Sequence, residues 1–306
     1  MPITNVDAAI LGVTEVDDAR RFYTDFGLTE REHSSSSADF VTLDSTEILV
    51  RAVGDRGLPK AVTDGSTIRE IVWGVDNRLE LAEVASELSK DRPVTEDADG
   101  TIHSLDEDGY GIAFRVSRQQ IIKPPEPRIN IYGAAPARPF NTRMDFLLAI
   151  RPTSIAHVVV FTTDVEKARS FYVDRLKFRI TDRFYDDKGV RGVFLRSEGY
   201  SYHHNLFLTQ SPKRGLHHIA FPVADFNDVV MGGKHAHQQG WESKMGPGRH
   251  IIGSNYFWYF NSPCGGAMEL TADIDRADDN WVAKDWKFEP ENTMTWSATI
   301  NDFHKK

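Results

Sequence analysis

Residues 157–176 read His-Val-Val-Val-Phe-Thr-Thr-Asp-Val-Glu-Lys-Ala-Arg-Ser-Phe-Tyr-Val-Asp-Arg-Leu, a β-branched run that continues into a helical pattern. Residues 6–27 repeat this arrangement, and Phe22-Tyr23 superimpose on Phe171-Tyr172 at an offset of 149 residues (171 − 22). Apolar residues three and four positions apart predict an amphipathic helix after each strand. Because the later elements recur in the same order, the sequence is an internal duplication.

Short strands and helices separated by glycine and proline fill the remainder of the first half. The predicted elements are strands at 6–13, 40–43, 48–52, 68–75 and 111–116 and helices at 14–27 and 78–90. In the first helix Thr14 is a suitable N-cap, and Gly27 stands where the helix is expected to end.

A proline-rich segment separates the two halves, with the sequences Lys123-Pro-Pro-Glu-Pro127 and Ala134-Ala-Pro-Ala-Arg-Pro139. Such a composition is typical of a linker or an extended arm. We therefore predict an N-terminal domain at residues 1–120, a linker at 121–152, a C-terminal domain at 153–290 and a tail at 291–306.

The composition indicates a soluble globular protein, with 40% hydrophobic and 26% charged residues in a chain of 306. A net charge of −9 disfavours general binding to nucleic acid or to an anionic membrane. The single cysteine excludes an intrachain disulfide and suits a reducing compartment. No signal-peptide pattern or membrane-spanning run is present in the sequence, so we expect a cytoplasmic protein.

A histidine is unusual in a β-branched strand, and His157 therefore needs an explanation. About sixty residues later a second strand-like run contains His217-His218, and a third apolar strand contains Glu269. Two histidines and one carboxylate on three strands form a candidate metal site.

The duplication provides a comparison within one chain. Aligning the two halves places first-half residues opposite the candidate ligands as follows: Ala8 opposite His157, Glu70 opposite His218, and Phe114 opposite Glu269. If the strand architecture itself required the histidines, both halves would contain them. The difference indicates a function that is confined to the second half.

Together these residues resemble the vicinal-oxygen-chelate superfamily, and more narrowly the two-domain type I extradiol dioxygenases that cleave catechol rings. The resemblance covers nearly the whole chain and implies an α+β, glyoxalase-like fold of tandem βαβββ modules, paired into two similar domains. It also implies a metal in the C-terminal domain alone, with His157, His218 and Glu269 as ligands. His217 competes with His218, but the parallel of His157-Val-Val-Val-Phe with His218-Ile-Ala-Phe favours His218.

Three further positions match residues that surround the metal in that family. They are His204 before a short apolar strand, with His203 as the alternative, His250 in a Gly-Arg-His segment, and Tyr259, ten residues before Glu269. The resemblance implies that His204 is the acid–base catalyst. It further implies that His250 and Tyr259 donate hydrogen bonds to the oxygens of the substrate.

Two histidines and one carboxylate are the ligands of non-haem Fe(II) oxygenases and also suit Mn(II). The resemblance therefore implies an Fe(II) enzyme of aromatic catabolism that inserts both atoms of O2 into a catechol-type diol by meta cleavage. The expected partners are a small aromatic diol and O2, with neither nucleic acid nor membrane. Members of the family are generally homo-oligomers, and we expect the same here.

Other functions are compatible with parts of the pattern. The same triad acts on hydroquinones in related enzymes. Metal-dependent lyases, glyoxalases and glutathione transferases of the superfamily commonly build their site across paired modules, and binding proteins of the bleomycin-resistance kind need no triad. The absence of the triad from the first half argues against the enzymes that build their site across paired modules, and the presence of the triad argues against the binding proteins. From its position, we also expect the segment 273–306, with Trp281, Trp286 and Trp296, to cover the pocket.

Overall fold

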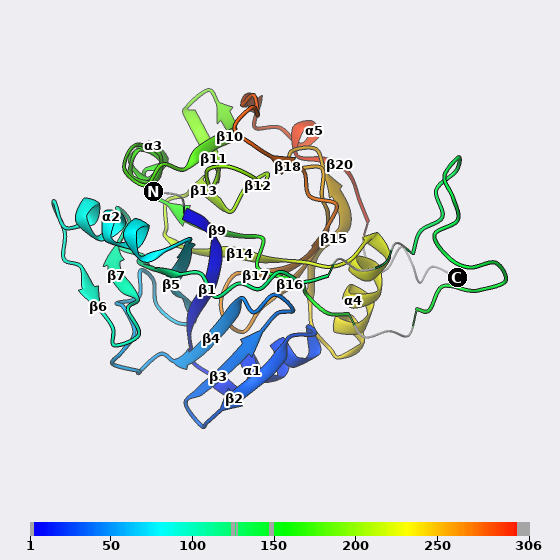
Figure 1. Ribbon diagram of the computed structural model, residues 1–306, viewed down its shortest axis with the longest axis horizontal. Helices are drawn as coiled ribbons and strands as arrows, with labels where there is room; N and C mark the ends of the chain where they lie inside the picture. Colours follow the sequence, from blue (N-terminus) through cyan, green and yellow to red (C-terminus); the bar gives the residue numbers. More distant parts are fainter. Residues whose placement is uncertain (1–2, 124–125, 127, 147–149, 299–306) are drawn as a thin grey trace.

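Two mixed β-sheets, one from each half of the duplicated sequence, form the framework of the protein (Figure 1). The computed structural model describes residues 3–123, 126, 128–146 and 150–298. Within these residues the first half forms an eight-stranded sheet and the second half a ten-stranded sheet. The structure is therefore of the α+β class, as predicted.

The first sheet consists of two βαβββ units whose leading strands, β1 and β5, pair antiparallel at its centre. The elements are β1 (Ile3–Val13), α1 (Val16–Asp25), β2 (Thr29–His33), β3 (Ser37–Val41), β4 (Glu47–Ala52), β5 (Thr67–Val75), α2 (Arg78–Leu88), β6 (Thr95–Glu96), β7 (Ile102–Leu105) and β8 (Gly111–Val116). The strands and helices predicted for this half are confirmed, with shifts of a few residues at their ends. Thr14 is not the N-cap of the first helix, because Glu15 occupies that position and makes no side-chain cap hydrogen bond.

The second sheet repeats this plan, and β9 and β14 pair antiparallel at its centre. The elements are β9 (His157–Thr162), α3 (Val165–Ser170), its π-helical continuation η1 (Phe171–Arg175), β10 (Arg179–Asp186), β11 (Gly189–Arg196), β12 (Ser201–Tyr202), β13 (Leu206–Gln210), β14 (Gly215–Pro222), α4 (Phe226–Gln238), β15 (Ser243–His250), β16 (Tyr256–Asn261) and β17 (Ala267–Ala272). After β17 come β18 (Arg276–Ala277), β19 (Lys284–Lys287), α5 (Pro290–Thr293) and β20 (Met294–Ser297). Of these strands, β12 and β18 pair with each other in a separate two-stranded sheet.

The strand registers correct one residue of the alignment between the halves. In the second sheet Ala220 faces both His157 and Glu269, and in the first sheet Val72 faces both Ala8 and Ala113. Ala113, and not Phe114, therefore corresponds to Glu269. Neighbouring residues of a strand point to opposite faces, and Phe114 is buried in the core on the other face.

Aromatic side chains join the two halves. In the first half, α1 packs against the second sheet: Phe22 contacts Trp241 with ring centroids 4.9 Å apart, and Phe26 contacts Phe221 at 5.7 Å. Trp73 of the first half meets Phe178 of the second at 4.9 Å. Such pairs contribute about 0.5–1.5 kcal/mol each beyond the area that they bury. One hydrophobic cluster consequently includes residues of both sheets.

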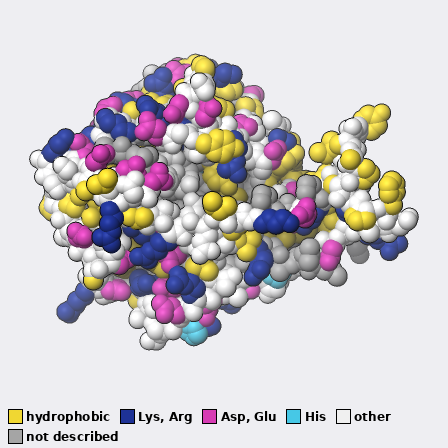
Figure 2. Space-filling view, viewed as in Figure 1, with side chains coloured by type: hydrophobic (Ala, Val, Ile, Leu, Met, Phe, Trp, Pro, Cys, Tyr) yellow, Lys and Arg dark blue, Asp and Glu magenta, His cyan; other side chains and the backbone are white. Residues whose placement is uncertain are grey.

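The segment between the halves runs along the surface and extends from the body as the green arm in Figure 1. Its described residues contain no regular helix or strand. Arg128 attaches it to α4 through ion pairs of 2.8 Å with Asp225 and 2.7 Å with Asp228. Apolar side chains of the arm, including Tyr132 and Phe140, are exposed, and yellow groups mark the arm in Figure 2.

The predicted tail at 291–306 is only partly described. Its residues Met294–Ser297 form β20, which pairs with β15 of the second sheet, whereas residues 299–306 lie outside the described part. The predicted domain limits remain a prediction. Among the described residues, every helix is too short or too polar to span a membrane.

Gly233 provides a test of how closely α4 packs on the second sheet. A Cβ at this position would lie 2.2 Å from Cε3 of Trp258, whose indole N–H donates to Ser243 Oγ at 2.8 Å. In the interior of a helix, replacing glycine by alanine normally stabilises the helix by about 1 kcal/mol. We expect overpacking to reverse this gain, so that Gly233→Ala lowers the free energy of unfolding by about 1–3 kcal/mol in denaturant titrations.

Gly54→Ala is the matched control, because a Cβ there meets no atom within 4 Å. We expect its stability to equal that of the wild type. Equal stability of both variants would contradict close packing at α4.

Asp106 gives a pH-dependent prediction at the contact between the halves. Tyr172 donates its hydroxyl to Asp106 Oδ2 at 2.9 Å, and the N–H groups of Asp108 and Tyr110 donate to Oδ1. Burial raises the pKa of Asp106 from 3.8 to about 7. A raised carboxyl pKa means that the neutral form stabilises the fold, so its contribution is complete below about pH 4 and is lost as the pH rises through 7.

Asp106→Asn keeps a neutral acceptor for the two N–H groups. We expect the stability of the wild type to fall relative to this variant, by a few kcal/mol, between about pH 4 and pH 7. Denaturant titrations at several pH values measure the difference. A difference that does not change with pH would contradict the assignment.

Candidate active site

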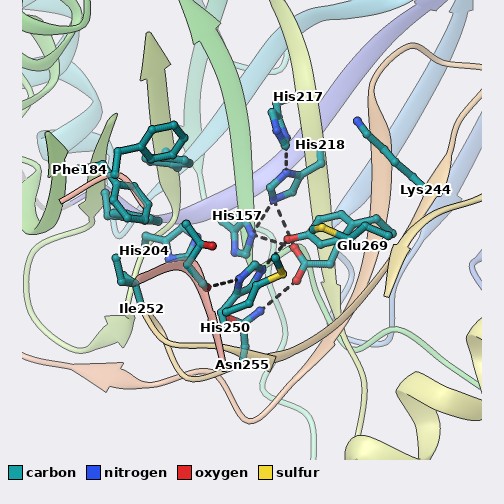
Figure 3. A pocket seen from close by; sticks show the side chains of 17 residues that line it. His157, Phe184, His204, His217, His218, Lys244, His250, Ile252, Asn255 and Glu269 are labelled. Atoms are coloured by element: carbon teal, nitrogen blue, oxygen red, sulfur yellow. Dashed lines mark hydrogen bonds and ion pairs between the residues drawn. The ribbon is translucent and has the colours of Figure 1, made fainter. Parts of the chain in front are cut away.

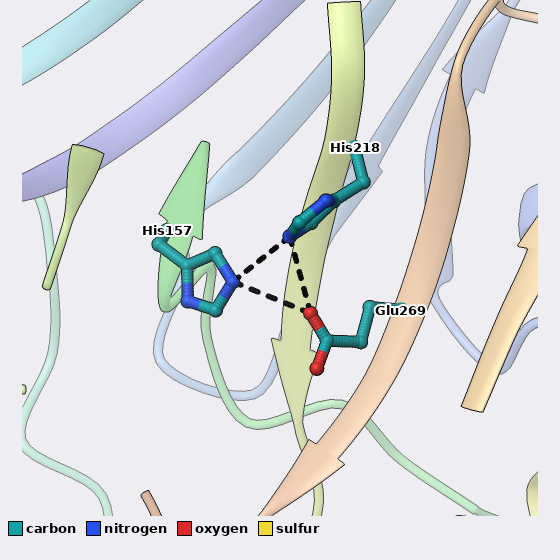
Figure 4. A group of neighbouring side chains, drawn as sticks. All are labelled: His157, His218 and Glu269. Carbon is teal, nitrogen blue, oxygen red and sulfur yellow. Dashed lines mark hydrogen bonds and ion pairs between the residues drawn. The ribbon is translucent and has the colours of Figure 1, made fainter. Parts of the chain in front are cut away.

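Three neighbouring strands bring the candidate ligands together on one face of the second sheet (Figure 4). His157 begins β9, His218 lies on β14 and Glu269 lies on β17. Since Ala220 faces both His157 and Glu269, and His218 is two residues before Ala220, all three side chains point to the same side. Strand pairing thus brings three residues that are far apart in the sequence into one cluster.

The ligand atoms are spaced as a metal ion would require. His157 Nε2 and His218 Nε2 are 3.1 Å apart, and Glu269 Oε2 is 3.3 Å from each of them. Metal–ligand bonds of about 2.1 Å at right angles separate two ligand atoms by about 3.0 Å. Among the described residues no hydrogen bond satisfies the buried Oε2 of Glu269. These three residues could therefore hold a metal ion.

The protonation states also suit a metal. Burial lowers the pKa of His218 to about 4, so its imidazole is neutral at pH 7. Burial acts to raise the pKa of Glu269, but the adjacent rings of His157 and His218 outweigh this effect and hold the pKa of that carboxyl well below its usual range. Neutral imidazole and ionised carboxylate are the forms that bind metals.

Two contacts orient the candidate ligands from behind. Asn255 donates its amide to Glu269 Oε1 at 3.0 Å and to Thr271 Oγ1 at 2.8 Å. His217 Nδ1 lies 2.7 Å from His218 Nδ1. A β-bulge between Leu216 and His218 turns His217 toward the same cavity, which the alternation of a regular strand would not do.

Asn255 is not among the residues predicted from the sequence. It precedes an aromatic strand, and no periodic pattern or spacing distinguishes it from a loop asparagine.

The residues predicted to surround the ligands lie beside them (Figure 3). His204, in the connection between β12 and β13, packs against His157 with ring centroids 4.0 Å apart and ring planes tilted by 32°. His250, at the end of β15, lies 2.9 Å through Nε2 from the hydroxyl of Tyr259. Tyr259 is opposite Glu269 in the pairing of β16 with β17. The structure thus brings all six predicted residues together, and their roles remain predictions.

A cavity of about 490 Å³ opens over this cluster, a volume within the usual range for small-molecule sites. Its apolar wall consists of Phe184, Phe194, Phe207, Ile252 and Phe288. In Figure 3 Phe184 and Lys244 lie on opposite sides of the cluster. The cavity therefore has an apolar side and a cationic side.

The segment after β17 closes part of this cavity, as expected. Phe288, Thr293 and Met294 line it, and the carbonyl of Thr293 accepts a hydrogen bond from His250 Nδ1 at 3.1 Å. The three tryptophans of the segment are not in the cavity lining. One of them, Trp281, instead packs on His203, with ring centroids 5.2 Å apart.

Comparison with known proteins agrees with this architecture. Residues 154–270 match the Glyoxalase/Bleomycin resistance protein/Dioxygenase superfamily. The chain is 36% identical over 156 residues to Metapyrocatechase 2 of Cupriavidus necator, an alignment that covers 50% of this chain and 47% of that protein. The chain thus spans about half the length of the curated relatives that it matches.

Solved structures extend the likeness to the whole fold. The Mn(II)-bound glyoxalase from Novosphingobium aromaticivorans has a TM-score of 0.74 at 20% identity, covering 96% of this chain and 91% of that one. Homoprotocatechuate 2,3-dioxygenase from Arthrobacter globiformis has a TM-score of 0.75 at 15% identity, covering 100% and 91%. At these identities the likeness confirms the fold alone. Residues 154–270, which contain the three candidate metal ligands, thus form a domain of the Glyoxalase/Bleomycin resistance protein/Dioxygenase superfamily.

Proposed function

We propose that the protein is an extradiol ring-cleavage dioxygenase, which inserts both atoms of O2 into a catechol-type diol. The observation that carries the proposal is the cluster of His157, His218 and Glu269, spaced for a metal at the base of a substrate-sized cavity. The 36% identity to a protein named metapyrocatechase supports the same reaction. The predicted product is a ring-opened semialdehyde of the muconic type.

The proposed metal is Fe(II), with Mn(II) as the alternative, held by these three residues. When bound, it would supply the positive charge that lowers the pKa of a diol hydroxyl. A divalent ion and the Glu269 carboxylate leave one positive charge, which a catechol monoanion neutralises. The first half cannot form the same set of three metal-binding side chains, because alanines occupy two of the three corresponding positions. These are Ala8 and Ala113.

His250 and Tyr259 are proposed to orient the diol. A carbonyl oxygen only accepts, so the contact with Thr293 places the proton of a neutral His250 on Nδ1, and its Nε2 accepts from Tyr259. Burial raises the pKa of Tyr259 well above its ordinary value, so the phenol keeps its proton. In this arrangement the hydroxyl proton of Tyr259 can also be shared with a diol oxygen. The hydrogen bond to His250 fixes the orientation of that hydroxyl.

The cavity favours a diol that bears an apolar substituent. Phe194 and Phe207 stack with ring centroids 4.0 Å apart and form a flat surface beside His204. A ring or alkyl group packed there would be removed from water, at about 25 cal/mol for each Å² buried. We therefore propose a substituted catechol in preference to catechol itself.

The first test is anaerobic reconstitution with Fe(II), followed by addition of oxygen and a panel of catechols and hydroquinones. We expect one O2 to be consumed for each catechol, together with a yellow ring-fission product. Apolar-substituted catechols should show the highest kcat/KM. Parallel samples with Mn(II) identify the active metal, and absence of oxygen uptake with every diol would contradict the function.

The second test removes single ligands. We expect His157→Ala and Glu269→Gln to reduce the bound iron, measured by elemental analysis, to a small fraction of the wild-type value. The Gln variant removes the charge and retains the shape. His235→Ala, on the exposed face of α4, is the control and should bind iron normally. Unchanged iron in both ligand variants would disprove the assignment.

A further inference from the structure

Behind the cavity, one carboxylate and two histidines form a buried hydrogen-bonded network. His204 Nδ1 lies 3.1 Å from His203 Nδ1, and His203 Nε2 lies 3.1 Å from Asp182 Oδ2. The exposed fractions are 5% for His204, 0% for His203 and 3% for Asp182. We call these three residues the His204 network.

The direction of each hydrogen bond follows from the carboxylate. Asp182 only accepts, so His203 carries its proton on Nε2 and has a lone pair on Nδ1. That lone pair accepts the Nδ1–H of His204. The unprotonated nitrogen of His204 is therefore Nε2, on the opposite side of a ring that lines the cavity.

The segment after β17 fixes this arrangement. The backbone N–H of Lys284 donates to Asp182 Oδ1 at 2.8 Å, and the N–H of His203 donates to the carbonyl of Asp275 at 2.8 Å. The ring of Trp281 packs on His203, and its indole N–H donates to the carbonyl of Thr181 at 3.0 Å. Asp182 and His203 are thus each held by this segment in addition to their contacts within the network.

A purely structural explanation accounts poorly for Asp182. A buried carboxylate is costly unless it is paired, and an apolar side chain usually fills such a position at lower cost. In the described part of the chain its partners are a histidine and a backbone N–H, with no lysine or arginine among them. Such an arrangement is typical of a carboxylate that orients a catalytic imidazole.

We propose that Asp182 and His203 are positioning residues, which hold His204 in the tautomer whose Nε2 accepts a proton from the bound diol. This rests on the proposed dioxygenase function. The diol hydroxyl loses its proton to Nε2, the positive imidazole is stabilised through His203 by Asp182, and Nε2 returns the proton later in the same turnover. His204, and not His203, is consequently the residue that contacts the substrate.

An isosteric substitution tests the direction of the network. In Asp182→Asn, the N–H of Lys284 still requires an acceptor, so the amide oxygen faces Lys284 and the NH2 group faces His203. Both histidines must then exchange tautomers, which places a proton on the cavity-side Nε2 of His204. We expect kcat to fall by about 10²- to 10⁴-fold, with the iron content and the KM for the diol within about twofold of wild type.

Three further variants separate orientation from folding. His203→Gln can accept from His204 and donate to Asp182, so we expect its kcat to stay within about tenfold of wild type. His203→Phe removes both hydrogen bonds and should match the loss in Asp182→Asn. Asp186→Asn, on the same strand, is the control and should be fully active. Equal losses in the Gln and Phe variants would overturn the proposal.

A spectroscopic measurement tests the network without turnover. We propose ¹⁵N NMR of the histidine rings in the full chain loaded with diamagnetic Zn(II). The wild type should show the proton on Nε2 of His203 and on Nδ1 of His204, and Asp182→Asn should show the reverse. A wild-type proton on Nε2 of His204 would overturn the proposal. The expected tautomers without diol cleavage would instead reject the dioxygenase function and leave the network intact.

Discussion

Two imidazoles and one carboxylate, all buried and within 3.3 Å of one another, impose the constraint on which the site depends. Removing such groups from water is costly unless their lone pairs are satisfied. A divalent cation satisfies all three at once. The strands β9, β14 and β17 contribute rigidity, because their paired registers fix the three Cβ positions before any metal binds. The cavity, Tyr259 and the His204 network are all arranged around this cluster of three residues.

The first half shows what the same framework does without this constraint. Ala8 and Ala113 pack with Val72 in a small apolar cluster at the corresponding face. Glu70, at the position of His218, is buried and instead bonds to His103 at 3.1 Å. The duplicated strands are therefore stable with or without the ligand set. This supports the view that the histidines of the second half serve a function and are not demanded by the fold.

Much of the fold and of the candidate site could be predicted from the sequence, because local residue patterns determine these features. The duplication and the helix after β9 follow from periodicity, and the three candidate ligands follow from polar residues in apolar strands. The one-residue error at Phe114 arose because a short apolar strand does not fix its own register, which depends on pairing with its neighbour. Asn255 and Asp182 were missed for a related reason: each acts across strands on a residue that is distant in sequence.

Backbone contacts from the segment after β17 determine the histidine tautomers. These tautomers are therefore harder to predict from the sequence than the candidate metal ligands. Backbone atoms of this segment bond directly to His250, His203 and Asp182, through the carbonyls of Thr293 and Asp275 and the N–H of Lys284. Any residue offers these groups, so the amino-acid sequence does not reveal them. The same segment also supplies part of the cavity lining. Changes in this segment can therefore alter the cavity lining and the proton positions of these histidines together, while the three candidate metal ligands on the central strands stay unchanged.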